Sequence, residues 1–181
     1  ADDYPRLGNL IKCNPAIKTA ADQAAIIQAL KDGRLDIIAT DHAPHTSEEK
    51  ASSDYLKAPS GLPLVQDALL CVLELYHDGI LSLEEVVLRT AHNPAIRYKV
   101  LERGFLREGY RADLVLVDPD GQTQASDERA LSKCGWTPFA GETFRSKILS
   151  TLVNGEPVYR EGRIIEAGAA ERLQFGVQRD L

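Results

Sequence analysis

Two short apolar runs flank a helical stretch in the first quarter of the chain. Residues 9–13 and residues 35–40 are mostly apolar, and each run ends at a polar or Pro-containing turn, which predicts two buried strands. The residues between them carry apolar side chains at helical spacing: Ile26, Ile27 and Leu30. This order predicts a strand–helix–strand crossover, which places the two strands side by side and parallel.

The limits of the helix are visible in its flanking residues. Thr19 and Asp22 have the spacing of a capping box, which satisfies backbone N–H groups at a helix start. Gly33 is a typical stop, because glycine readily adopts the left-handed conformation found after helix ends. We therefore expect the helix to begin after Thr19 and to end before Gly33.

The middle of the chain predicts a loop and then helices. Residues 46–60 are polar and lack periodicity, so we expect a long loop of the kind that covers functional sites. Residues 62–77 have a helical apolar face with Pro63 in the first turn. A capping-box pair opens another helix, and a further short one follows an Asn-Pro pair: Ser82 with Glu85, then Asn93-Pro94.

The last third has the pattern of strands. Residues 112–118 form a β-rich run. The turn Asn154-Gly155 separates residues 148–153 from residues 157–159, and Asn-Gly is the strongest short signal for a hairpin. Residues 162–165 are a further candidate strand. We therefore expect a small β module over residues 103–166, with residues 119–145 as a long excursion and residues 167–181 as a tail of undefined structure.

Composition excludes several classes of protein. The chain has 181 residues, of which 44% are apolar, and its formal charge is −6. An acidic chain without a basic block does not suit nucleic acid or an anionic membrane surface. Its apolar runs are far shorter than the ~20 residues that a membrane span needs. We expect neither nucleic acid nor a membrane as a partner.

Cysteine and methionine usage bears on compartment and completeness. The three cysteines are scattered and form no C-x-x-C pair, so neither a zinc knuckle nor a disulfide framework is indicated. Idle thiols suit a reducing cytoplasm, where we expect the protein. Because the chain contains no Met at all, we also expect it to begin inside a longer protein.

The most informative run is Thr-Asp-His-Ala-Pro-His at residues 40–45, directly after the second predicted strand. A carboxylate at the end of a barrel strand can bind a divalent metal or act as a general base, and Asp41 occupies such a position. Pro44 stiffens the turn, and His45 has a ring suited to an anionic substrate group or a metal. His42 is expected to point away from the site. A helix cap or a structural ion pair is the alternative for Asp41.

Two further positions are candidates on similar grounds. Asn14 follows the first predicted strand on the same side of the sheet as Asp41, where its amide reaches a ring amide or a carboxylate. Its alternative role is to cap the turn before Pro15. Gly61, in the run Pro-Ser-Gly at residues 59–61, allows close backbone approach to a ligand, or else only forms the turn into a helix. Lys12 and Lys18 suit an anion clamp, although solvated lysines are commoner.

The chain resembles the dihydroorotases among the cyclic amidohydrolases, from Asn9 to about Ile165. The residues that carry the resemblance are the runs KCNPAIK at 12–18, TDHAPH at 40–45, APSGL at 58–62, NPA at 93–95, EGYRADLV at 108–115, TPFAG at 137–141 and VNG at 153–155. Related hydantoinases and allantoinases share the Asp-His start but usually lack a His at the position of His45.

The resemblance implies a fold and an activity. It implies an α/β architecture: residues 1–102 as the C-terminal part of a TIM-type (β/α)8 barrel, followed by part of a small β-sandwich module. It also implies zinc-dependent, reversible hydrolysis of dihydroorotate to N-carbamoyl-aspartate in pyrimidine biosynthesis. A hydroxide would bridge two zinc ions. Asp41 would bind zinc and carry the proton, while Asn14, His45 and the backbone at Ser60-Gly61 would bind substrate.

The remaining zinc ligands of that family, a His-x-His pair and a carboxylated Lys among them, have no counterpart here. We therefore expect the chain to be the C-terminal half of such an enzyme, inactive without an N-terminal half as its partner. Another cyclic amidohydrolase, such as a dihydropyrimidinase or an allantoinase, and a non-catalytic structural relative are the alternatives. An isolated half would expose strand edges and associate, and a homo-oligomer is left open.

Overall fold

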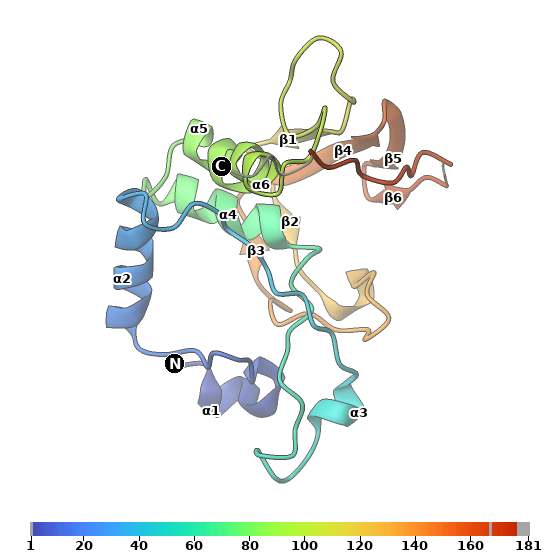
Figure 1. Ribbon diagram of the computed structural model, residues 1–181. Coiled ribbons are helices and arrows are strands. Elements are labelled where there is room, and N and C mark those ends of the chain that lie inside the picture. The colour runs from blue at the N-terminus through green and yellow to red at the C-terminus, as the bar shows by residue number, and fades with distance from the viewer. Residues whose placement is uncertain (1, 167, 177–181) are drawn as a thin grey trace. The chain divides into compact units, whose positions relative to one another are not determined.

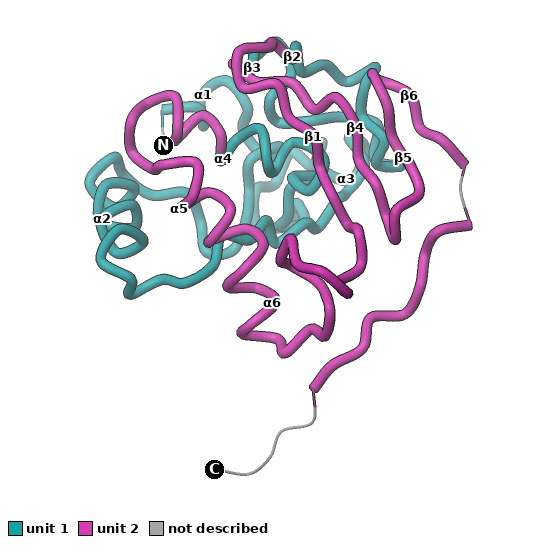
Figure 2. Tube along the Cα trace, turned by 90° about the horizontal axis from the view of Figure 1, so that it is seen from above, with its two compact units in different colours: residues 1–72, 123–144 teal, residues 73–122, 145–181 magenta. Residues whose placement is uncertain are grey.

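The computed structural model describes residues 2–166 and 168–176, and part of the predicted tail, Ala167 and residues 177–181, lies outside this description. Two compact units make up the chain, and each contains two separate stretches of sequence (Figure 2). Unit 1 consists of residues 1–72 and 123–144, and unit 2 of residues 73–122 and 145–181. The predicted division between residues 102 and 103 stays a prediction. No helix among the described residues has the length and apolar character that a membrane crossing requires.

Unit 1 is built from short helices and irregular segments. Its helical elements are α1 (Tyr4–Leu7), the 3-10 helix η1 (Gly8–Ile11), α2 (Ala20–Lys31), α3 (Ser47–Lys50) and η3 (Asp127–Arg129). Its only sheet within the described ranges pairs β2 (Thr123–Gln124) with β3 (Thr143–Phe144). Its core contains Ile11, Leu62 and Trp136, all less than a tenth exposed. The core therefore joins three segments that are far apart in the sequence.

The predicted helix of unit 1 is confirmed at both ends. Thr19 is the N-cap of α2, and the capping box with Asp22 is complete in both directions. Gly33 has a φ of 73°, as expected after a helix end. The predicted apolar stripe, however, is only partly covered: Leu30 is buried, but Ile26 is 60% exposed.

The two strands predicted to flank this helix are wrong for the chain as described. Residues 8–11 form the 3-10 helix η1, and residues 35–40 have no regular secondary structure. An apolar run becomes a strand only where a neighbour takes up its backbone hydrogen bonds. Here the only ladder contact near the second run is an isolated parallel bridge between His42 and Leu62. The strand–helix–strand crossover is therefore reduced to its helix.

Helices dominate the first part of unit 2. The helix α4 (Ala68–His77) crosses from unit 1 into unit 2 and ends at His77 as predicted, but begins six residues after the predicted start. The predicted Ser82–Glu85 capping box is present at α5 (Leu83–Val87). A π-helical turn, η2 (Leu88–His92), then connects α5 to α6 (Asn93–Arg97), so the predicted second and third helices run on without a break.

A four-stranded antiparallel sheet completes unit 2, in the order β1-β4-β5-β6 (Figure 1). The strands are β1 (Leu114–Asp118), β4 (Lys147–Val153), β5 (Glu156–Arg160) and β6 (Arg163–Ile164). Asn154 and Gly155 both have positive φ, at 52° and 85°, and form the predicted turn between β4 and β5. The expected β-rich run and hairpin are therefore confirmed.

Candidate functional site

Three candidate segments of unit 1 meet at Gly61. The Gly61 N–H donates to the carbonyl oxygen of Lys12, with 2.9 Å between nitrogen and oxygen. On the other side of the same segment, the Ala43 N–H donates to the Leu62 carbonyl oxygen at 3.1 Å. The segment of residues 60–62 thus lies between residue 12, two positions before Asn14, and residue 43, between Asp41 and His45.

Gly61 is required by this packing. Its φ is 146°, a conformation that side chains other than glycine rarely adopt. A Cβ placed there would collide with the backbone of Ala43 and lie 2.7 Å from the Ala43 Cβ. Gly61 is therefore a point of close approach to the segment that holds Asp41 and His45, and its predicted approach to a ligand stays a prediction.

Asp41 is exposed and has a φ of 47°, in the left-handed region. Such a backbone is uncommon outside glycine, asparagine and aspartate. Within residues 2–166 and 168–176, no three His, Cys, Asp or Glu side chains gather closely enough to hold a metal ion. Among these residues, Asp41 therefore belongs to no group of three such side chains.

His45 is held from two directions. Its carbonyl oxygen accepts a hydrogen bond of 2.8 Å from the indole Nε1 of Trp136, a member of the unit 1 core. Its ring Nδ1 lies 3.5 Å from the carboxylate of Glu49, which also accepts from the Thr46 N–H in the capping box of α3. The backbone of His45 is therefore fixed by the core, and its ring by the start of the next helix.

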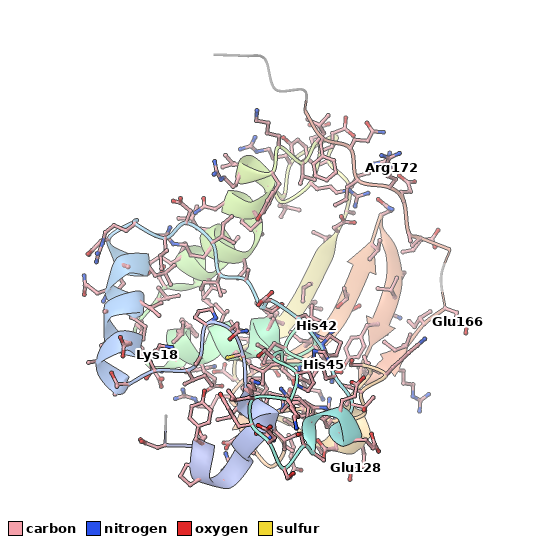
Figure 3. All side chains as sticks on the ribbon, turned by 60° about the horizontal axis from the view of Figure 1, so that its bottom comes forward. Lys18, His42, His45, Glu128, Glu166 and Arg172 are labelled. Atoms are coloured by element: carbon pink, nitrogen blue, oxygen red, sulfur yellow. The ribbon has the colours of Figure 1, made fainter. Side chains whose placement is uncertain are left out.

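The loop predicted for residues 46–60 includes the four-residue helix α3. Its position next to the two histidines of the motif can be followed in Figure 3. The Nδ1 atom of His42 accepts a hydrogen bond of 3.2 Å from the Val65 N–H. His42 thus ties the motif to the segment before α4, which is a structural use of the ring.

Of the remaining candidates, Asn14 and Ser60 differ in exposure, and Lys18 is hydrogen-bonded to the backbone. Asn14 is exposed and precedes Pro15 through a cis peptide bond, and Ser60 is half-buried. Lys18 donates to the carbonyl oxygen of Ala16, two residues earlier, and lies beside the start of α2 (Figure 3). It therefore has a local backbone partner rather than a place in the cluster around Gly61.

Two side chains that bind backbone atoms of the candidate site were missed by inspection of the sequence. Lys50 at the end of α3 is 1% exposed, and burial lowers the pKa of its ammonium group. Trp136 belongs to the excursion at residues 119–145, more than 90 positions from the histidine that it supports. A lysine in a polar run and a tryptophan in a distant loop carry no local signal of either contact.

Comparison with known proteins places these segments in a family. The model of the amidohydrolase family matches residues 10–158. A dihydroorotase from Clostridium acetobutylicum is 40% identical over 155 residues, and one from Halobacterium salinarum is 42% identical over 158 residues. These matches cover 85% and 87% of this chain. The chain spans only 36% and 37% of the length of the two relatives.

Solved structures agree. The L-hydantoinase (dihydropyrimidinase) of Arthrobacter aurescens superimposes with a TM-score of 0.86 at 28% identity, over 91% of this chain and 38% of that protein. The dihydropyrimidinase of Brevibacillus agri has a TM-score of 0.81 at 26% identity, over 94% of this chain and 39% of that protein. With the family model matching most of the sequence, the chain belongs to the amidohydrolase family.

Proposed function

We propose that the complete protein carrying this chain is a dihydroorotase, which hydrolyses the cyclic amide of dihydroorotate reversibly to N-carbamoyl-aspartate. The observation that carries the proposal is the convergence at Gly61 of the three segments that hold Asn14, Asp41 with His45, and Ser60. The identity of about 40% to named dihydroorotases supports it. The remaining two thirds of those relatives would correspond to an N-terminal part outside this sequence.

The finer architecture is part of the same proposal. Residues 1–102 would be the C-terminal part of a TIM-type barrel, and residues 103–166 part of a small β-sandwich module. The isolated parallel bridge between His42 and Leu62 supports this assignment, because a complete barrel would supply further parallel neighbours for this segment. The exposure of Ile26 on α2 is explained in the same way, by elements that would pack against it.

Asp41 would carry the chemistry that this chain contributes. In this role its carboxylate takes a proton from the attacking water and passes it to the leaving amide nitrogen, so that one group serves as base and then as acid. The same carboxylate would be one ligand of a zinc centre with two ions, whose other ligands would come from the N-terminal part. When bound, such ions would make water more acidic and polarise the amide carbonyl.

Substrate binding would fall to residues around Gly61. The His45 ring and the exposed Asn14 amide are suited to the substrate carboxylate and to the ring amides. The Gly61 N–H is already donated to Lys12, so the backbone of Ser60 and the second lone pair of the Gly61 carbonyl are the groups left for substrate. The loop then binds the ring through backbone atoms, which no side-chain substitution removes.

A second cyclic amide is the competing substrate class. The superposition on a dihydropyrimidinase with a TM-score of 0.86 favours hydantoin or dihydrouracil as the alternative. The carboxylate of dihydroorotate separates the two classes, because a site selective for it needs a matched donor such as His45. Related rings without a carboxylate have no use for that donor.

The test is turnover by the complete protein, supplied with zinc, of dihydroorotate, dihydrouracil and hydantoin in parallel. We expect dihydroorotate alone to be opened, and Asp41→Asn to lower kcat by about 10³-fold or more without unfolding. Asp120→Asn is the matched control, because Asp120 is an exposed carboxylate of unit 2. Opening of hydantoin but not of dihydroorotate would move the protein to the alternative. Undiminished turnover by Asp41→Asn would refute the assigned role.

A further inference from the structure

Lys50 is a buried lysine of unit 1. Its side chain is 1% exposed, and it is one of the two largest side chains that are fully buried among the described residues. Lysine is almost never fully buried unless its charge is compensated, because removing an ammonium group from water is costly. The identity of its partners therefore defines its role.

The partners of Lys50 are three backbone carbonyl oxygens. Its Nζ donates to Lys12 O at 3.0 Å, to Pro59 O at 3.0 Å and to Gly61 O at 2.8 Å. An ammonium group has three N–H donors, so this set satisfies every one of them. Across the described residues, no ion pair of Lys50 with a carboxylate is present. The hydrogen-bond partners of the ammonium group are therefore peptide dipoles rather than a carboxylate.

These carbonyls belong to the segments that carry the proposed substrate contacts. Pro59 and Gly61 flank Ser60 on both sides, and Lys12 precedes Asn14 by two residues. Lys50 itself stands five residues after His45, at the end of α3. One ammonium group thus connects all three parts of the site, at the point where regular strand pairing is absent.

Lys12 makes a similar set of contacts nearby and offers a comparison. Its Nζ donates to Tyr55 O and Ala58 O, both at 2.6 Å, and lies 4.7 Å from the centre of the Tyr55 ring. These contacts hold the outer part of the loop, before Pro59. The two lysines therefore act on neighbouring but different stretches of the same loop.

We propose that Lys50 is a positioning residue, whose fixed ammonium group sets the Ser60-Gly61 backbone relative to Asn14 in the substrate site. The proposal rests on the proposed function for its kinetic consequence but not for its structural one. Met in place of Lys50 keeps the length of the side chain and removes all three donors, so that the Pro59 and Gly61 carbonyls lose this partner and the Lys12 carbonyl keeps only the Gly61 N–H. Arg cannot replace it, because a planar guanidinium does not direct donors at three converging oxygens.

The first experiment is chemical rescue of Lys50→Ala in the complete protein. The readout is the amide NMR signals of selectively labelled Gly and Ser residues. We expect the signals of Ser60 and Gly61 to move on substitution and to return when methylammonium fills the vacated space. Tetramethylammonium, which has no N–H donor, should leave them displaced. Lys57→Met, a control at an exposed lysine of the same loop, should leave the signals of Ser60 and Gly61 in place.

The second readout is kinetic, on whichever cyclic amide the wild-type protein opens. Lys50→Met should raise KM about tenfold or more, and methylammonium should restore the KM of Lys50→Ala in a saturable way. Rescue of the thermal midpoint with no recovery of KM would reduce Lys50 to a purely structural residue and overturn the proposal. Wild-type protein that opens no cyclic amide refutes the proposed function instead.

The outcome is defined even where substitution prevents folding. In the wild-type protein the Lys50 Nζ protons should exchange slowly with water, and their 15N signal should shift when N-carbamoyl-aspartate is added. A Lys50 signal that exchanges as fast as those of exposed lysines, or that ignores a ligand seen to bind by other signals, contradicts the proposal.

Discussion

Units 1 and 2 hold their backbones together in different ways. In unit 2, strands β1, β4, β5 and β6 pair with neighbours along antiparallel ladders, so each strand completes the hydrogen bonds of the next. In unit 1, the segments around Gly61 share only single backbone bonds, and side chains complete the set. Lys50, Lys12 and Trp136 all bind carbonyl oxygens there.

The difference shows where a functional site gains its adjustable geometry. A ladder repeats one spacing and leaves little choice in the direction of each carbonyl. Carbonyls that are bound by separate side chains can each point in a different direction. Because no neighbouring ladder bond replaces a lost side-chain donor, each of these contacts is needed to hold its carbonyl in place. We therefore expect substitutions around Gly61 in unit 1 to change activity as well as stability, and substitutions in unit 2 to change stability alone.

The largest effect should come from glycine positions. Gly61→Ala combines a backbone conformation reserved for glycine with a collision against Ala43, and we expect a loss of several kcal/mol together with activity. Gly155→Ala is the control in unit 2, where a Cβ finds only Ala112 Cβ at 3.9 Å. There the left-handed conformation alone costs about 1–2 kcal/mol.

Urea unfolding and turnover of the complete protein would check this pair. Equal losses of stability for Gly61→Ala and Gly155→Ala would mean that the contact with Ala43 relaxes easily. In that case the backbone of unit 1 shifts more easily than its packing indicates, and the expected difference between the two units is refuted.

The second largest effect is a contrast in pH dependence between two carboxylates. Burial raises the pKa of Asp67 in unit 1 above its ordinary 3.8, against a hydrogen bond from the Thr137 hydroxyl. For Asp113 in unit 2, burial also acts upward, but the Asn154 N–H and the Arg103 guanidinium outweigh it and lower the pKa. The ionised Asp67 carboxylate therefore destabilises the folded state, and the ionised Asp113 carboxylate stabilises it.

The signs follow from linkage. The stability contributed by Asp67 is complete below pH 3.8 and is lost as pH rises through its folded pKa, so Asp67→Asn should stabilise at neutral pH only. The contribution of Asp113 is present above pH 3.8 and is lost as pH falls through its folded pKa. Asp113→Asn should therefore destabilise by about 2 kcal/mol at neutral pH and progressively less in acid. Thermal midpoints of both variants across this range give the test; slopes of the same sign would contradict it.

The third effect concerns the hydrogen bond between the Trp136 indole and the His45 carbonyl. Trp136→Phe retains most of the apolar surface in the unit 1 core but removes this bond of 2.8 Å. We expect a loss of about 1 kcal/mol in the free energy of unfolding. We also expect the KM for dihydroorotate to rise more than this loss of stability alone would produce. Phe144→Leu, at a buried position elsewhere in unit 1, should lower stability without changing KM. A KM that follows stability equally in both variants would separate Trp136 from the site.

The contrast between the units also explains which elements are predictable from sequence. The hairpin at Asn154-Gly155 and the capping boxes at Thr19 and Ser82 depend on residues within a few positions of one another, and all three are present as predicted. The strands predicted at residues 9–13 and 35–40 depend on neighbours elsewhere, and neither forms a strand here. Contacts between residues close in the sequence can be predicted from a single chain, whereas strand pairing between distant segments cannot.

The candidate site divides along the same line. The motif at residues 40–45 and Gly61 stand out because their residue types are unusual for a plain turn, and the structure brings them together. The roles of Asn14, Asp41, His45 and Ser60 stay predictions. Lys50 gave no signal, because a lysine in a polar run has the pattern of a solvated one. Its burial depends on three carbonyls that converge only after folding.

The smallest and sharpest test uses two helix caps of the same kind, one in each unit. Thr46 caps α3 and Ser82 caps α5, and both complete a capping box with the Glu three residues later. Replacing either with Ala removes one side-chain acceptor from a short helix, and the expected loss is about 1 kcal/mol in each case. The stability measurement alone should not distinguish them.

Activity should distinguish them, because Thr46 follows His45 directly and its partner Glu49 also lies 3.5 Å from the His45 ring. When the cap is lost, the start of α3 frays, and the carboxylate that orients the ring loses its fixed place. We therefore expect Thr46→Ala to raise KM several-fold and Ser82→Ala to leave it unchanged, as measured by steady-state turnover of the complete protein. Equal KM values would show that the core contact through Trp136 is sufficient to orient His45, and that the helix after the motif serves only to bury Lys50.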